Sequence, residues 1–420
     1  MANNNNTKNL NVPNLRFPEF KGEWKETTLG KCVIQPLDYG MNVAAITYDG
    51  ENKYIRITDI DEQSSQYISD SPVSPAGQLL DKYIVEENDI LFARTGASTG
   101  KTYLYKKKDG KLYFAGFLIR AKIKTECNST FIFAQTKTVR YYKWVRFMSI
   151  RSGQPGINSQ EYASYRFLIP QKEEQDKIAK FLSLLDSRIE AQIKIIEKYE
   201  SLIKGIGNKL FSLKMRFKTN DGNDFPSWKT KSFENIGKIF NGLSGKAKED
   251  FGIGKPYIQY KQVFDSPQIQ IQNCGLVNVL DNENQNNVKY GDILFTVSSE
   301  TPDEIGMSSV LLDEVDEMYL NSFCFGYRLS SFEVLNPLYA SYFFRDSSFR
   351  NKLVKIAQGS TRYNISKSEF IKLEISLPCI EEQARIASFL SAVDEKIKEE
   401  KGILALYLTQ KSYLLRQMFI

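Results

Sequence analysis

Hydrophobic side chains recur every three or four residues along two stretches of the chain, which is the period of an α-helix. The first stretch carries this pattern at Ile178, Leu182, Leu185, Ile189 and Ile196. The second carries it at Ile386, Leu390, Val393, Ile397 and Leu404. Each apolar stripe has charged flanks, so neither helix is stable alone. We expect the stripes to pack on each other as an antiparallel coiled coil.

Both helices begin within the same short motif. Residues 168–182, LIPQKEEQDKIAKFL, return as residues 376–390, SLPCIEEQARIASFL, at an offset of 208, close to half of the 420 residues. The paired glutamates suit the positive end of the helix macrodipole. Gly205 and Gly207 are expected to weaken the last turns of the first helix. A repeat of this length predicts two similar units related by an approximate two-fold axis.

The segments before the two helices carry a weaker repeat of short apolar runs bounded by Gly, Asp and Asn, which is typical of strands. The sequence Asp-Ile-Leu-Phe, for example, occurs at 89–92 and again at 292–295. We expect strands at 54–57, 90–93, 114–119 and 293–297, and helices at 130–147 and 337–354.

The predicted fold class is α+β, with two mixed α/β domains related by pseudo-two-fold symmetry and separated by the two long helices. The expected parts are a disordered N-terminal tail at 1–14, a first domain at 15–170, a central helix at 171–216, a second domain at 217–378 and a C-terminal helix at 379–420.

Composition excludes several kinds of site. The chain has no histidine, and its five cysteines are widely spaced, so we expect neither a zinc cluster nor an imidazole base. No run approaches the roughly 18 apolar residues of a membrane span, and we expect a cytoplasmic protein without a membrane partner. A net charge of +6 permits DNA binding but does not indicate it.

Three local motifs resemble enzyme motifs but are incomplete. Residues 96–102, GASTGKT, have one residue too few for a P-loop and precede a strand-like run instead of a helix. Asn336-Pro337 fits a helix N-cap followed by proline at the first position better than a methyltransferase motif. Pro302-Asp303 has no nuclease partner motif after it. We therefore expect no catalytic residues, no metal and no cofactor in this chain.

Polar and basic loops recur at matching places in the two halves. Arg, Lys, Gln and Asn make the hydrogen bonds that distinguish base edges in the major groove. The candidate DNA contacts are Arg56, Thr58, Arg94, Thr95, Ser98, Lys101, Asn158 and Ser159 in the first half, and Gln259, Lys261, Gln262, Ser298, Ser299, Arg362 and Asn364 in the second. At each position the alternative is a solvated loop residue. Recurrence in both halves favours a shared role.

The doubled motif, which each time ends a segment containing Asp-Ile-Leu-Phe, resembles the specificity subunit of type I restriction-modification systems. The likeness covers nearly the whole chain from about residue 15. It implies two target recognition domains, each contacting one half of a bipartite site on double-stranded DNA, and long helices that set their spacing. One departure is that Val297 stands where the first half has Arg94, which makes equivalent use of that loop doubtful.

The resemblance also implies partners. Two modification (methyltransferase) subunits and ATP-dependent restriction subunits would dock on this chain. S-adenosylmethionine, ATP and Mg²⁺ would be bound by those subunits. Two alternatives remain open at this point: a self-contained DNA methyltransferase or nuclease, and a coiled-coil scaffold that does not contact DNA.

Overall fold

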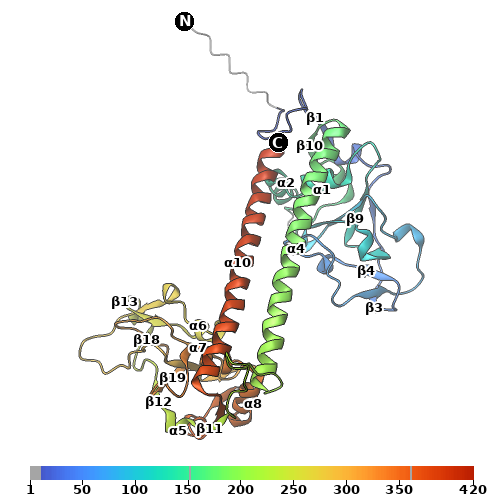
Figure 1. The fold of residues 1–420 in the computed structure, drawn as a ribbon. Helices are drawn as coiled ribbons and strands as arrows, with labels where there is room; N and C mark the ends of the chain where they lie inside the picture. The colour runs from blue at the N-terminus through green and yellow to red at the C-terminus, as the bar shows by residue number, and fades with distance from the viewer. Residues whose placement is uncertain (1–10, 151–152, 360–361) are drawn as a thin grey trace. The chain divides into compact units, whose positions relative to one another are not determined.

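A computed structural model describes residues 11–150, 153–359 and 362–420 (Figure 1). The chain divides into two compact units. Unit 1 consists of Met1–Ile193 and Gly402–Ile420, and unit 2 is the continuous segment Lys194–Lys401. Each unit combines a mixed α/β domain with segments of both long helices.

Of the predicted tail, residues 1–14, residues 1–10 lie outside the described part of the chain. Its last four residues are described and belong to the fold of unit 1. The carbonyl of Asn11 accepts a hydrogen bond from the Trp24 amide, and Pro13 is buried.

Unit 1 is built around an antiparallel sheet in the order β2-β9-β6-β7. These strands are Asp38–Tyr39, Leu118–Lys122, Asp89–Ala93 and Thr102–Leu104. Three smaller pairs are β1 (Lys25–Thr28) with β10 (Arg166–Ile169), β3 (Ala45–Thr47) with β5 (Val73–Pro75), and β4 (Lys53–Ile55) with β8 (Leu112–Phe114). The short helices are α1 (Ser129–Gln135), α2 (Val139–Met148) and α3 (Ser159–Ala163).

Unit 2 contains the corresponding antiparallel sheet in the order β12-β19-β15-β17. These strands are Gly237–Asn241, Cys324–Leu329, Ile293–Thr296 and Ser308–Val310. The other sheets are β14-β13-β18 (Gly275–Val277, Phe251–Ile258, Tyr319–Leu320), β16-β21-β20 (Ser298–Ser299, Tyr363–Ile365, Ala357–Gln358) and β11-β22 (Lys229–Ser232, Glu374–Leu377). The short helices are α5 (Phe233–Ile236), α6 (Tyr260–Asp265), α7 (Pro337–Phe343), α8 (Ser347–Ile356) and α9 (Lys367–Phe370).

Three predicted elements are wrong in detail. The helices expected at 130–147 and 337–354 are each two helices, α1 with α2 and α7 with α8. The breaks occur because Thr138 and Asp346 cap new helices by accepting the backbone N–H groups of Tyr141 and Ser348. The strand expected at 114–119 is the end of β8, a tight turn and the start of β9. The N-cap at Asn336 is confirmed, because its side chain accepts the Tyr339 N–H.

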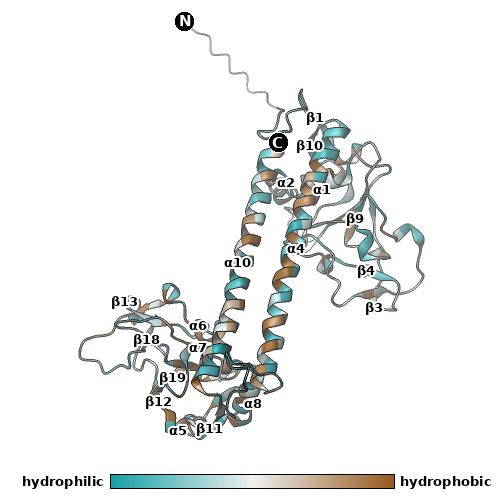
Figure 2. Ribbon diagram, viewed as in Figure 1, coloured by the Kyte–Doolittle hydropathy of each residue, from teal (hydrophilic) through white to brown (hydrophobic). Residues whose placement is uncertain are grey.

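The two long helices are α4 (Lys172–Phe211) and α10 (Ile380–Met418), and α4 continues through Gly205 and Gly207 to its end. Hydrophobic positions recur along both (Figure 2). In unit 1, the first part of α4 packs on the last part of α10. The core there contains Ile178, Leu182, Leu185 and Ile189 together with Leu414, Met418 and Phe419, and Leu404 packs against it.

In unit 2, the last part of α4 packs on the first part of α10. Leu210 and Phe211 share a core with Ile386 and Leu390. Ile196 and Ile397 are buried, and Val393 is half-buried. Each unit thus contains one antiparallel contact between the two helices (Figure 1).

The second glutamate of the repeated motif has the same contacts in both units. Glu174 accepts two hydrogen bonds from Arg16, at 2.8 and 2.7 Å, and one from the Trp24 indole N–H at 3.2 Å. Glu382 accepts the corresponding bonds from Arg216, at 3.0 and 2.7 Å, and from Trp228 at 3.3 Å. Both carboxylates are fully buried, so one such ion pair anchors the start of each long helix.

The glutamine that follows joins the long helix to a short one. Gln175 donates to the Pro170 carbonyl and accepts the N–H of Asn128, the residue that caps α1. Gln383 does the same with the Pro378 carbonyl and the N–H of Asn336. The repeated motif is therefore explained by the internal packing of each unit.

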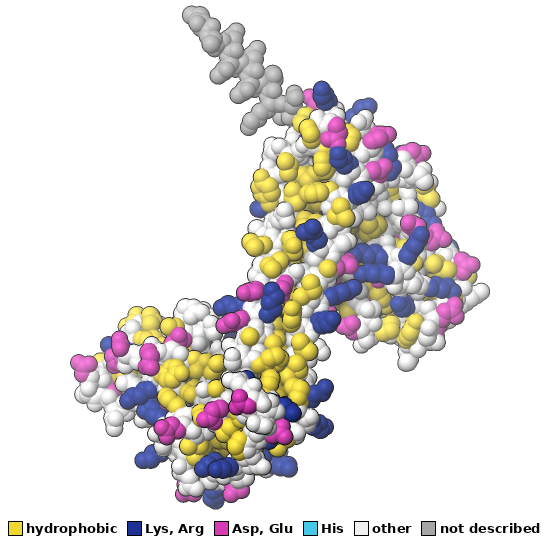
Figure 3. All heavy atoms as spheres, in the orientation of Figure 1, with side chains coloured by type: hydrophobic (Ala, Val, Ile, Leu, Met, Phe, Trp, Pro, Cys, Tyr) yellow, Lys and Arg dark blue, Asp and Glu magenta, His cyan; other side chains and the backbone are white. Residues whose placement is uncertain are grey.

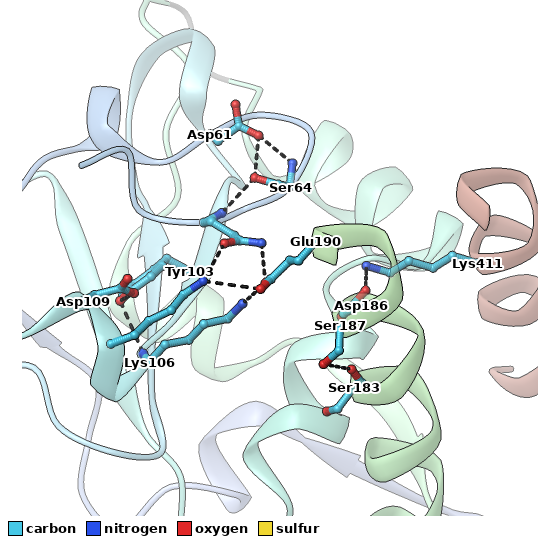
Figure 4. Close-up of polar contacts among 12 residues, drawn as sticks. Asp61, Ser64, Tyr103, Lys106, Asp109, Ser183, Asp186, Ser187, Glu190 and Lys411 are labelled. Carbon is cyan, nitrogen blue, oxygen red and sulfur yellow. Dashed lines mark hydrogen bonds and ion pairs between the residues drawn. The ribbon is translucent and has the colours of Figure 1, made fainter. Parts of the chain in front are cut away.

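A charged cluster joins the middle of α4 to the sheet domain of unit 1 (Figure 4). The Glu190 carboxylate accepts hydrogen bonds from Lys106 and Gln66, both at 2.8 Å, and contacts Lys108 at 3.4 Å. These contacts hold the segment that follows strand β7 against the helix.

Candidate nucleic-acid interface

In unit 1, two loops that are far apart in sequence lie together at the end of β6. These paired loops are residues 94–101 and 153–159. The Gly96 N–H donates to the Pro155 carbonyl at 2.9 Å, and the Ile157 N–H donates to the Arg94 carbonyl at 2.9 Å. The loop at 94–101 contains a short 3-10 helix and leads into strand β7, so it does not have the strand-to-helix geometry of a P-loop.

Arg94 is held in place by an aromatic ring. Its guanidinium lies 4.9 Å from the centre of the Tyr39 ring, and the Tyr39 hydroxyl accepts the Ser159 N–H at 3.1 Å. Tyr39 is 38% exposed at the end of strand β2. Arg94 and Ser159 are thus gathered on one small surface, because Tyr39 contacts both. Thr95, which follows Arg94, pairs with Gly156 of the second loop.

Other candidates in unit 1 make contacts within the fold. The Arg56 guanidinium makes two 2.8 Å hydrogen bonds with Asp59, which raise its pKa, and Thr58 bonds to the same carboxylate. The Lys101 ammonium lies 3.6 Å from Glu62. The Asn158 side-chain oxygen accepts the Glu161 N–H and caps α3. Ser98 is half-buried in the 3-10 helix.

In unit 2, the corresponding paired loops are residues 297–300 and 362–366, the latter following residues 360–361, which lie outside the described part. Ser298 pairs with Asn364 and Ser299 with Tyr363 in the short sheet β16-β21. The Ile365 N–H donates to the Val297 carbonyl at 2.9 Å, as Ile157 does to Arg94 in unit 1. Ser366 caps α9, the counterpart of α3.

An arginine is present in the paired loops of unit 2, although Val297 occupies the place of Arg94. It is Arg362, an exposed residue that donates to the Ser298 hydroxyl at 3.1 Å. Ser298, Ser299, Arg362 and Asn364 are therefore brought together. The basic side chain comes from the second loop of the pair in unit 2 and from the first loop in unit 1.

A cavity of about 470 Å³ lies beside the paired loops of unit 2. Aromatic, hydroxyl and charged side chains line it: Tyr260, Phe264, Ser298, Ser299, Glu300, Glu304, Phe323 and Arg362. The Tyr260 hydroxyl donates to the Ser298 carbonyl at 3.0 Å. Helix α6 thus forms one wall of the cavity, with the rings of Tyr260 and Phe264 roughly parallel.

The three candidates around α6 differ in exposure. Gln259 and Lys261 are exposed, whereas Gln262 is half-buried and contacts the Cys274 sulfur. Tyr39, Phe117, Tyr260 and Phe323 are not among the residues predicted from the sequence. A phenylalanine stands in both halves, at 117 and 323, but the equivalence of the two positions becomes visible only from the matching backbone hydrogen bonds of their turns.

Two buried carboxylates near the central strands make hydrogen bonds within the sheet domains. Asp89 is the first residue of β6, and its carboxylate accepts the Glu86 N–H at 2.9 Å. Asp292 directly precedes β15, and its carboxylate accepts the Lys289 N–H at 2.7 Å. Burial raises the pKa of Asp89 to about 6, against the opposing effect of the Glu86 amide. Burial also raises the pKa of Asp292, although Arg328 bonds to it at 2.6 and 2.8 Å.

Charges of both signs are interspersed on the visible face of each unit (Figure 3). Among the described residues, no group of three His, Cys, Asp or Glu side chains is placed to hold a metal ion. None of the described helices is both long and apolar enough to cross a membrane.

The solved structures that share this fold include two with similar coverage of the whole chain. One is the type I restriction-modification system S subunit from M. genitalium, with a TM-score of 0.57, 16% identity and coverage of 97% of this chain and 99% of that chain. The other comes from work on complex assembly and conformational transition of the type I R-M system, with a TM-score of 0.56, 16% identity and coverage of 94% and 96%.

Two proteins of Methanocaldococcus jannaschii are similar in sequence. The type I restriction enzyme MjaVIII specificity subunit is 25% identical over 383 residues, which cover 83% of this chain and 85% of that protein. The putative MjaX specificity subunit is 25% identical over 361 residues, which cover 79% and 80%. The family described as "Type I restriction modification DNA specificity domain" matches twice, at residues 42–198 and 226–406. The chain therefore belongs to this family, and it is a DNA sequence-recognition subunit with two specificity domains.

Proposed function

We propose that each unit contacts one half of a bipartite target on double-stranded DNA. Residues 15–170 and 217–378 act as the two target recognition domains, and residues 171–216 and 379–420 act as the spacer helices. The observation that carries this proposal is the repeated pair of loops. In both units, one loop at the end of the central strand is bonded through its main chain to a second loop that enters a capped helix.

The chain itself is non-catalytic in this proposal, and it docks two modification subunits and the restriction subunits in the cytoplasm. S-adenosylmethionine, ATP and Mg²⁺ are bound by those partners. The absence of histidine from the sequence supports this division of labour, because an imidazole base is not available here. Half-sites about one helical turn apart suit recognition from one face of the duplex.

The test is genome-wide mapping of methylated adenines in cells that express this chain with its modification subunit. We expect one motif with two specific halves and a fixed non-specific gap. A motif with a single specific block would contradict the assignment of one domain to each half-site.

Two rivals predict other results. A self-contained enzyme would methylate or cut DNA as a purified chain, and we expect neither activity. A coiled-coil scaffold would leave no sequence-dependent footprint when the complex is bound to random duplexes. A split footprint would exclude the scaffold.

A further inference from the structure

Phe117 stands at the tip of a tightly held turn in unit 1. The turn is residues 115–118, between β8 and β9. Three backbone hydrogen bonds fix it: Ala115 N–H to the Ile55 carbonyl at 3.0 Å, Leu118 N–H to the Ala115 carbonyl at 2.8 Å, and Arg94 N–H to the Phe117 carbonyl at 3.0 Å. The third bond attaches the turn to the first of the paired loops.

The corresponding turn of unit 2, residues 321–324, is fixed by the same three bonds. The Asn321 N–H donates to the Ile258 carbonyl at 3.0 Å, and the Cys324 N–H donates to the Asn321 carbonyl at 3.0 Å. The Val297 N–H donates to the Phe323 carbonyl at 3.0 Å. Phe323 therefore holds the position in unit 2 that Phe117 holds in unit 1.

The two turns have kept one residue in common. Their sequences are Ala-Gly-Phe-Leu and Asn-Ser-Phe-Cys, so phenylalanine is the shared side chain. It is 56% exposed in unit 1 and 57% exposed in unit 2, although its chain neighbours Leu118 and Cys324 are buried. Core packing does not account for an aromatic ring that is retained in the exposed position of both turns.

The surroundings of both rings suit a nucleic acid. The backbone of Phe117 is bonded to Arg94, whose guanidinium is held on Tyr39. Phe323 lines the cavity that Arg362 and Ser298 also line. In the major groove an exposed phenylalanine ring can make an apolar contact with a thymine methyl group, and a cation beside it can contact phosphate or guanine.

We infer that Phe117 and Phe323 are the aromatic base contacts of the two recognition domains, one for each half-site. This inference rests on the proposed function. Each ring contacts a base of the bound duplex, and the neighbouring arginine fixes the position of that half-site. The rigid turn lowers the entropic cost of placing the ring.

The test measures binding of the full chain, in complex with its modification subunit, to three duplexes: the mapped target, and the target with either half-site scrambled. Phe117→Ala and Phe323→Ala should each weaken binding to the target roughly tenfold, the size expected for loss of one specific contact at a base pair. Each variant should bind as well as the wild type to the duplex in which the half-site contacted by its own domain is scrambled, because the lost contact is already absent there. This duplex should be a different one for each variant. Phe→Leu variants should retain part of the affinity.

Ile34→Ala and Phe332→Ala are matched controls. Ile34 is 60% exposed and bonds to Lys122 at the opposite end of β9, and Phe332 is 43% exposed beyond the opposite end of β19. Both should bind all duplexes normally. Unchanged binding by the Phe117 and Phe323 variants, an equal loss on every duplex, or a loss of assembly with the modification subunit would overturn the inference. A wild-type complex without preference for the mapped target would instead contradict the proposed function.

Discussion

The paired loops of the two units have the same main-chain connections and different side chains. In unit 1 the arginine is Arg94, at the end of the central strand and held on the Tyr39 ring. In unit 2 the arginine is Arg362, in the second loop and bonded to Ser298. Because the connecting bonds join backbone atoms, the side chains of these loops can change without loss of the connection. This comparison shows how one scaffold can present two recognition surfaces.

The buried ion pairs at the start of the long helices are alike in the two units. Substitutions there should have the largest effect, which is on the free energy of unfolding. Glu174→Ala should leave the Arg16 charge without its buried partner and lower the free energy of unfolding by about 3–5 kcal/mol. Glu382→Ala should cost less, because the Arg216 side chain is 28% exposed whereas that of Arg16 is 13% exposed. Denaturant unfolding of both variants checks this order. Equal losses would mean that solvation of the arginine does not matter.

The arginines of the paired loops should have the next largest effect. Arg94→Ala and Arg362→Ala should each reduce specific DNA binding about tenfold, since a good contact with a base is worth roughly 1–3 kcal/mol. The losses should fall on different half-sites, as measured by mapping methylated adenines. Arg166→Ala is the control, because this exposed arginine pairs with Glu26 on the surface. If both variants relaxed the same half-site, the comparison of the two units would fail.

The buried aspartates should give both units a pH dependence of the same sign, because burial raises the pKa of Asp89 and of Asp292. The pKa of Asp89 is raised in the folded state, so its stabilising effect is present at low pH and is lost as the pH rises through about 6. Asp89→Asn should remove this decline and raise stability at pH 7 by about 1 kcal/mol. Asp292→Asn should remove a decline of the same sign, but its gain at pH 7 should be smaller, because Arg328 loses two charge-assisted bonds.

Denaturant unfolding at pH 4, 5.5 and 7 separates these outcomes. A steeper decline for the Asp89→Asn variant than for the wild type would contradict the predicted sign.

The smallest effect is expected at glycines inside the long helices. A Cβ atom at Gly205, in unit 2, or at Gly402, in unit 1, would meet open space. Each substitution by alanine should raise the free energy of unfolding by about 0.5–1 kcal/mol. Thermal unfolding should show a small increase for each variant. A loss in only one unit would reveal a local constraint that the other unit does not have.

The helical hydrophobic period predicted the two long helices, and the repeated motifs predicted the half-length repeat and the central strands. The hydrophobic pattern missed the breaks before α2 and α8, because the helical period of hydrophobic residues continues across each short interruption. The breaks are made by the N-caps Thr138 and Asp346. The pattern also missed the turn at 115–118, because the apolar run there has no polar residue to mark it.

Individual candidate residues were harder to judge. Arg94 could be selected because its chemistry is visible in one loop, whereas its join to the loop at 153–159 is a tertiary contact. Tyr39 was missed because the sequence does not show that its ring lies beside Arg94. The role of Arg362 as the cation of unit 2 follows from its bond to Ser298, 64 residues earlier in the chain. Exposure of Phe117 and Phe323 likewise depends on turn geometry.

Unit 1 is discontinuous, and this has a consequence for synthesis on the ribosome. Its core contains Leu414, Met418 and Phe419 as well as Trp24, whose ring contacts Phe419. Unit 2 is one uninterrupted segment. The half that is translated first must therefore wait for residues 414–419 to emerge before its interior can close. The half that is translated second can assemble as soon as residues 194–401 have left the exit tunnel.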